Sequence, residues 1–108
     1  MEKERLKPLR APVLIAVGVD KSADPRGLEI ENICSVAAAV ENILIAAHAE
    51  GLGAMWRTGP AARDPQVKQF LGFDPDQLIL GFVYLGYPDP EVPFVERPSY
   101  EDRSVWME

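Results

Sequence analysis

The stretch that most constrains the fold is the apolar run of residues 29–51. Apolar residues recur in it at steps of three and four, the spacing that builds one face of an α-helix. The positions that share this spacing are Ile30, Ile33, Cys34, Ala37, Val40, Ile43, Leu44 and Ala47. Val36 and further alanines lie off that stripe, so the helix is apolar on nearly every side, which is typical of a buried helix. Gly51 suits the left-handed position that ends many helices.

A helix of this kind needs protein around it, and the chain is short. With 108 residues it forms one domain at most, and a domain of that size buries only roughly 65% of the surface that its unfolded chain exposes. We infer that a second chain covers part of the helix, and we expect a homodimer because two-fold dimers are the commonest oligomers. Glu41, Asn42, His48 and Glu50 interrupt the apolar run. No unbroken stretch of about 18 apolar residues exists, so we expect no membrane span.

Charge and cysteine content exclude several classes of function. The formal charge of −6 argues against a nucleic-acid partner, which selects for a basic surface. Cys34 is the single cysteine, so no internal disulfide forms and we expect a reducing, cytoplasmic compartment. We interpret Cys34 as a small core residue. Cys34 and the single histidine, His48, do not make up a metal-ligand set, so we expect no metal site. Charged residues follow Met1, and we expect no signal peptide.

Further strands and helices are predicted on both sides of the long helix. Residues 12–19 are a continuous apolar run that suits a strand buried on both faces. Residues 77–87 are rich in β-branched and aromatic side chains and predict a second strand. Asp64 and Pro65 are typical of the start of a helix that Gly72 ends. Shorter predicted segments are a loop at 21–27, a strand at 53–56 and a helical turn opened by Pro60. This alternation indicates an α+β protein with an α/β layered architecture.

The two ends of the chain differ from its middle. Residues 1–10 are charged and are expected to form a short helix or a loose arm. Residues 89–108 hold three prolines, six acids and isolated aromatic side chains, and they cannot form a core alone. We interpret them as an extended C-terminal arm laid on another surface, such as a partner subunit. A frayed terminus is the alternative.

Residues 56–59, Trp-Arg-Thr-Gly, are the one polar cluster whose composition suits a ligand. Arg57 is a planar, permanently charged donor at a strand end, and such a donor suits a phosphate or a polar heterocycle. Thr58 adds a hydroxyl, Gly59 allows close backbone approach, and Trp56 offers a flat face to an aromatic ring. The alternative is that Arg57 pairs with a surface acid and Trp56 belongs to the core. No phosphate-binding glycine loop is recognisable elsewhere.

Five motifs follow one another in order between residues 10 and 90. They are residues 11–17 (APVLIAV), the helix end 46–53 (AAHAEGLG), the motif 55–59 (MWRTG), the helix 67–72 (VKQFLG) and the strand 79–88 (ILGFVYLGYP). In this order and at these spacings they resemble the C-terminal half of FMN-dependent nitroreductases. The small-subunit group that carries Trp-Arg in the motif is the most similar.

The resemblance implies a fold, an activity and a set of site residues. The fold is a mixed sheet flanked by helices, in an intertwined homodimer whose C-terminal arm crosses to the partner. The activity is ping-pong transfer of hydride from NAD(P)H to FMN, and then to a small-molecule acceptor such as a nitroaromatic compound or a quinone. The flavin carries out the electron chemistry while the protein orients it. The implied binding residues are Trp56, Arg57 and Thr58 for FMN, and Ala46, Ala47, His48, Ala49, Glu50 and Gly51 for NAD(P)H.

One departure from that family bears on function. Its members begin with a helical segment whose Arg-Ser-x-Arg-like motif binds the FMN phosphate, and residues 1–10 carry no such motif. We therefore expect residues 1–108 to be an N-terminally truncated nitroreductase-like domain with an arm at 89–108. Two hypotheses stay open. One is a flavin-dependent oxidoreductase or a truncated form of one, and the other is a non-catalytic dimeric α/β module that has lost flavin binding.

Overall fold

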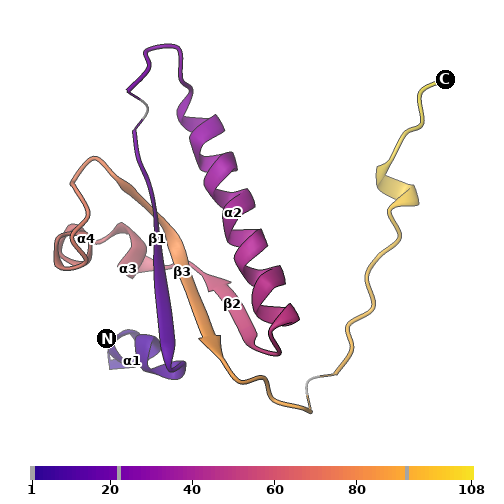
Figure 1. Ribbon diagram of the computed structural model, residues 1–108, viewed down its shortest axis with the longest axis horizontal. Helices are drawn as coiled ribbons and strands as arrows, with labels where there is room; N and C mark the ends of the chain where they lie inside the picture. The colour runs from indigo at the N-terminus through magenta and orange to yellow at the C-terminus, as the bar shows by residue number, and fades with distance from the viewer. Residues whose placement is uncertain (1, 22, 92) are drawn as a thin grey trace.

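The computed structural model of the protein describes residues 2–21, 23–91 and 93–108. Met1, Ser22 and Val92 lie outside the described residues, together with the parts of the predicted N-terminal arm, 21–27 loop and C-terminal arm that fall on them. The helices and strands, shown in Figure 1, are α1 (Glu2–Leu6), the 3₁₀ turn η1 (Lys7–Arg10), β1 (Val13–Val19), α2 (Glu29–Ala49), β2 (Gly53–Arg57), α3 (Pro60–Arg63), α4 (Pro65–Phe70), β3 (Leu78–Gly86) and η2 (Glu101–Arg103).

The three strands form one sheet in the order β1-β3-β2, so β3 lies in the centre. Both outer strands pair with β3 antiparallel, and the register places Leu14 on one side of Tyr84 and Met55 on the other. The predicted α+β layered architecture is confirmed. The mixed sheet that the resemblance implies also needs a parallel pairing, and the described strands make none.

α2 covers one face of the sheet, and α3 and α4 lie on the other side (Figure 1). α2 contacts all three strands. Its end is the predicted one: Gly51 has φ +77°, and the Leu52 N–H donates to the Ala47 carbonyl at 2.8 Å. A glycine in the left-handed conformation lets the chain turn back there. The N–H groups that follow the helix can then donate to the free carbonyls of its last turn.

α2 is buried along one side only. Val40 on the inner side is 0% exposed, whereas Ile30 and Ile45 on the outer side are 61% and 59% exposed. The prediction of a helix buried on nearly every side is therefore wrong for one copy of the chain, because a three-stranded sheet covers one side of a helix. Cys34 is also exposed, so its assignment to the core is wrong. By length and composition alone α2 passes as a candidate membrane span, but a helix of a protein core passes the same test.

The helix α4, on the side of the sheet away from α2, begins with a side-chain cap. The Asp64 carboxylate accepts a hydrogen bond from the Gln66 N–H at 2.8 Å, and Pro65 lies in the first turn of α4. Gly72 then leaves the helix with φ +82°. The predicted start and end of this helix are therefore confirmed, because both depend on the local hydrogen bonding of a few neighbouring residues.

The core between this layer and the sheet is small. Ala62 of α3 packs with Ile79 and Phe82 of β3. β1 is a strand as predicted, but of its residues only Val19 is buried and Val13 is half exposed. The prediction that this strand is buried on both faces is wrong, because β1 is an edge strand of a sheet with partial cover on both sides.

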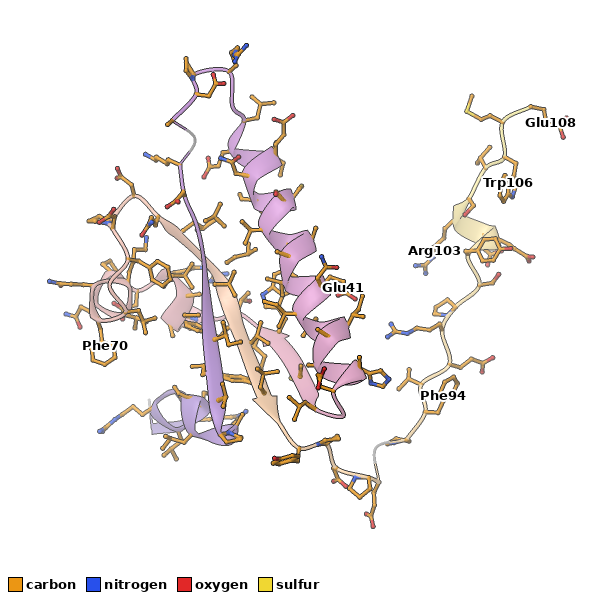
Figure 2. The ribbon with its side chains drawn as sticks, viewed as in Figure 1. Glu41, Phe70, Phe94, Arg103, Trp106 and Glu108 are labelled. Carbon is orange, nitrogen blue, oxygen red and sulfur yellow. The ribbon has the colours of Figure 1, made fainter. Side chains whose placement is uncertain are left out.

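Residues 93–108 extend away from the folded body (Figures 1 and 2). Phe94 and Trp106 are exposed along this segment. The Cα radius of gyration is 17.1 Å, compared with about 13 Å for a compact chain of this length. The interpretation of this segment as an arm laid on a partner subunit stays a prediction.

Candidate functional site

Arg57 stands at the end of β2 and lies over an aromatic ring. It pairs with Phe82 across the sheet, and its guanidinium carbon lies 5.9 Å from the centroid of the Tyr84 ring. That distance is within the cation–π range of about 6 Å. The half-buried Arg57 makes no ion pair with a described residue. Among the described residues the structure thus shows no acid paired with Arg57, and the charge of Arg57 faces the side of the sheet turned away from α2.

Trp56 faces the opposite side of the sheet. It pairs with Val83, and successive side chains of a strand point to opposite faces. A Cβ atom added at Gly81 would collide with the Trp56 indole, so the ring lies directly over that glycine. Trp56 and Arg57 are both predicted FMN ligands, but their side chains lie on opposite faces. A flat ring on the Arg57 side contacts Trp56 through its backbone alone.

Two hollows open on the face that holds Arg57. The first, named the Thr58 hollow, has a volume of about 350 Å³ and is lined by Thr58, Gly59, Tyr84 and apolar side chains of β1 and α4. The second, named the Arg57 hollow, has a volume of about 600 Å³ and is lined by Met55, Arg57 and Tyr84 among others. Tyr84 lines both, so the hollows adjoin. Arg57 and Thr58 thus each line one of two adjoining hollows, and a ligand-binding motif requires such open space beside it.

Basic residues of the N-terminal segment border these hollows. Arg5 and Lys7 line the Thr58 hollow, and Arg10 lines the Arg57 hollow. Asp89 is the acid among the described lining residues of the two hollows. The region is therefore locally basic in a chain of formal charge −6. Arg5, Lys7 and Arg10 were not among the predicted site residues, and their signal in the sequence is the recurrence of basic side chains just before the first predicted strand.

The predicted NAD(P)H segment lies at the far end of β2. Of its members Ala47 is buried, while Ala46, His48, Ala49, Glu50 and Gly51 are exposed. β2 runs from Gly53 to Arg57, a span of about 13 Å at the rise of a β-strand. Within one chain the structure therefore does not bring this segment together with Arg57 and Thr58.

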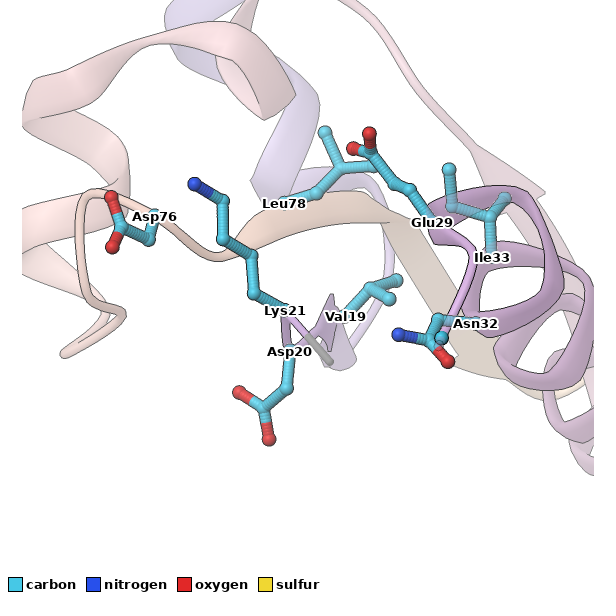
Figure 3. A pocket seen from close by; sticks show the side chains of 9 residues that line it. Val19, Asp20, Lys21, Glu29, Asn32, Ile33, Asp76 and Leu78 are labelled. Carbon is cyan, nitrogen blue, oxygen red and sulfur yellow. The ribbon is translucent and has the colours of Figure 1, made fainter. Parts of the chain in front are cut away.

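A third hollow, of about 200 Å³, lies where β1 ends and α2 begins (Figure 3). Its acids, Asp20, Glu29 and Asp76, point in different directions. No group of three or more metal-ligating side chains occurs in the described part of the chain. In the adjacent loop the Arg26 guanidinium donates to Asp24 at 3.0 Å and holds the pKa of that carboxyl below its usual value. None of the predicted site residues lines this hollow.

A long helix laid on an antiparallel sheet, with an arginine motif at a strand end, places the chain among nitroreductase-like α+β proteins. The profile of the Nitroreductase family matches residues 1–87. The chain belongs to the nitroreductase family.

Known relatives agree with this membership. "Putative NAD(P)H nitroreductase YdjA" of Escherichia coli K12 is 34% identical over 88 residues, which are 82% of this chain and 48% of that protein. A nitroreductase-like family protein from Bacillus cereus has a TM-score of 0.78 at 26% identity, over 100% of this chain and 62% of that one. A nitroreductase with bound FMN from Bacteroides fragilis has a TM-score of 0.67 at 25% identity, over 91% and 52%. The chain spans about half the length of the curated relatives it matches.

Proposed function

We propose that the chain forms part of an FMN-dependent NAD(P)H oxidoreductase of the nitroreductase type, which reduces nitroaromatic or quinone-like acceptors. The observation that carries this proposal is the position of Arg57, which lies over Tyr84 and lines one of two adjoining hollows. A permanent cation on an aromatic platform, beside several hundred Å³ of open space, suits a planar anionic ligand. The FMN bound to the Bacteroides relative supports FMN as that ligand, and the name of the Escherichia relative supports NAD(P)H as reductant.

The residues of this chain have binding and orienting roles in the proposal. FMN, when bound, supplies the hydride chemistry. Arg57 would hold the flavin by donating from its guanidinium, and a charge-assisted bond of this kind is stronger than a neutral one. The Thr58 hydroxyl offers a further hydrogen bond from the lining of the adjoining hollow. Trp56 contributes through its backbone, because its ring lies on the other face of the sheet.

The segment 46–51 has a different role from that of Arg57. Hydride transfer needs reacting atoms about 3–3.5 Å apart, whereas the length of β2 separates this segment from Arg57. We propose that Ala46, His48, Ala49, Glu50 and Gly51 contact a part of NAD(P)H that is remote from its nicotinamide ring. Ala47 is buried and acts by packing instead of by contact with the dinucleotide.

We also propose that the working form is a cytoplasmic homodimer. The outer side of α2 carries Ile30, Cys34 and Ile45 exposed to solvent, and a second copy of the same helix offers a matching apolar surface. A two-fold interface is self-complementary, so one such surface suffices to form it. The exposed Cys34 thiol suits a reducing compartment.

Titration of FMN with the purified chain tests the flavin proposal. Binding should quench flavin fluorescence saturably, with a dissociation constant in the micromolar range or weaker. The reason is that Arg57 supplies one charge-assisted bond, worth about 1.5–3 kcal/mol, instead of a full set of phosphate ligands. Riboflavin, titrated in parallel, reports the contribution of the phosphate. If quenching fails to saturate below about 1 mM, a free energy near −4.1 kcal/mol, the proposal fails and the non-catalytic module takes its place.

A further inference from the structure

The Thr58 hollow combines apolar walls with a basic border. Its lining is mostly apolar and includes the rings of Phe82 and Tyr84. Its charged lining residues are Arg5 and Lys7, and no acid is among the described residues that line it. A pocket with apolar and aromatic walls and a few charged groups suits an aromatic ring that carries the opposite charge.

Arg5 is the lining residue best suited to recognise an anionic group. Its side chain is exposed, and within the described part of the chain no acid pairs with it. The planar guanidinium of an arginine can donate to both oxygens of a carboxylate at once. The whole chain has a formal charge of −6. The basic border therefore gives this hollow a local preference for anions that the net charge of the chain would not predict.

The two hollows differ in size, and both are bordered by cations. The Arg57 hollow has a volume of about 600 Å³ and is also lined by Arg10, whereas the Thr58 hollow has a volume of about 350 Å³. A flavin has three fused rings and suits the larger hollow. Its single phosphate can neutralise the cations of one hollow, which leaves those of the other for a second anion. Tyr84 lines both hollows, so ligands in the two hollows are neighbours.

We propose that the Thr58 hollow selects one class of electron acceptor, a single aromatic ring that carries a carboxylate or a similar anionic group. Arg5 is the residue that recognises this group. The inference rests on the proposed function for the role of the ligand as acceptor. It concerns binding alone and includes no transfer step, so flavin is not needed to test it. A neutral acceptor of the same shape binds more weakly, because it gains nothing from the charge of Arg5.

An NMR titration with two compounds of nearly the same shape tests the selection by charge. The compound para-nitrobenzoate carries the anionic group, and para-nitrobenzamide has a neutral amide in its place. Each is added to the isotope-labelled, flavin-free chain, and the shift of the Gly59 amide in the lining of the hollow reports binding. At low ionic strength the benzoate should bind at least threefold more tightly than the benzamide. At about 1 M salt, where the screening length is about 3 Å, this preference should decrease.

Two matched variants assign the preference to its residue. Arg5→Gln should abolish the preference for the benzoate and leave the affinity for the benzamide unchanged, because the substitution removes a charge and keeps the apolar lining. Arg103→Gln is the control with the same loss of charge. Arg103 is exposed on the C-terminal arm and lines neither hollow (Figure 2), so this variant should keep the preference.

The outcomes separate this inference from the proposed function. Equal affinity of the wild-type chain for the two compounds overturns the inference. A preference that survives Arg5→Gln also overturns it, as does a Gly59 amide that neither compound shifts. If Arg5→Gln abolishes the preference in a chain that does not bind FMN, the anion site stands and the flavin proposal alone fails.

Discussion

At the scale of single residues, Arg57 owes its position to an aromatic neighbour and not to a counter-ion. The Tyr84 ring holds the guanidinium against the sheet, and no described acid pairs with it. A cation–π contact satisfies the charge without occupying the N–H donors in the ring plane of the guanidinium. A ligand-binding arginine needs such donors, and Arg57 lines the Arg57 hollow.

Replacing Arg57 by alanine should weaken FMN binding without unfolding the protein. Loss of one charge-assisted hydrogen bond costs about 1.5–3 kcal/mol, which lowers affinity roughly ten- to a hundredfold. Fluorescence titration of the variant measures the change. Arg63→Ala, an exposed arginine on α3, is the matched control and should bind FMN as the wild type does. Loss of the thermal transition in Arg57→Ala would show instead that the arginine is structural.

Gly81 is required by the close approach of two neighbours. An added Cβ atom would lie 2.8 Å from the Arg57 carbonyl oxygen and would also meet the Trp56 indole. Gly81→Ala should therefore destabilise the protein by about 1–3 kcal/mol, the usual cost of overpacking. Urea unfolding measures this loss. The same substitution at Gly86, where the nearest contact is the Pro12 ring at 3.1 Å, should cost less. An equal effect at both positions would contradict the proposed clash.

At the scale of elements, α4 depends on its cap. The Asp64 carboxylate accepts a hydrogen bond from the Gln66 N–H. An N–H in the first turn of a helix has no partner within the helix. Asp64→Ala should lower the free energy of unfolding by about 1 kcal/mol. Asp76→Ala, which changes an exposed acid that caps no helix, is the control for loss of charge. If the two variants unfold at the same urea concentration, the cap contributes nothing.

The ends of the elements were predictable from the sequence because they depend on local chemistry. Gly51 and Gly72 adopt the left-handed conformation that ends a helix, and Asp64 caps the next one. Burial was not predictable in the same way. Periodicity indicates which side chains of α2 avoid water. It does not show whether these side chains are buried by the same chain or by a second chain. Cys34 was placed in the core for that reason, and it lies on the outer side.

The candidate site was predictable in part. The motif placed Arg57 and Thr58 at a strand end, and the structure shows both beside open hollows. Successive side chains of a strand point to opposite faces, so the sequence could have predicted that Trp56 and Arg57 do not share a face. Their neighbouring positions in one motif favoured a single binding site for both instead. The basic rim of Arg5 and Lys7 depends on how the N-terminal segment packs beside β1 and α4. Such a long-range contact leaves no pattern in neighbouring residues.

At the scale of the whole molecule, two surfaces are unusually apolar for a chain of 108 residues. One is the outer side of α2 and the other is the opposite face of the sheet, where Leu14 and Met55 lie beside Tyr84. They lie on opposite sides of the molecule (Figure 1), so each can be covered without obstructing the other. A two-fold partner on the outer side of α2 would therefore leave the sheet face that holds Arg57 open.

The outer side of α2 should make the chain a homodimer. Light scattering at micromolar concentration should give twice the chain mass of 11.9 kDa. Ile45→Glu should shift the protein to monomer, because burying an isoleucine is worth about 1.5–3 kcal/mol and a two-fold interface repeats the change in both copies. Ile45 is exposed in one copy, so the fold of the monomer should survive. Arg63→Gln, at an exposed position on α3 across the sheet from α2, should leave the dimer intact. A wild-type protein that stays monomeric at the same concentration would show that the outer side of α2 is not a dimer interface.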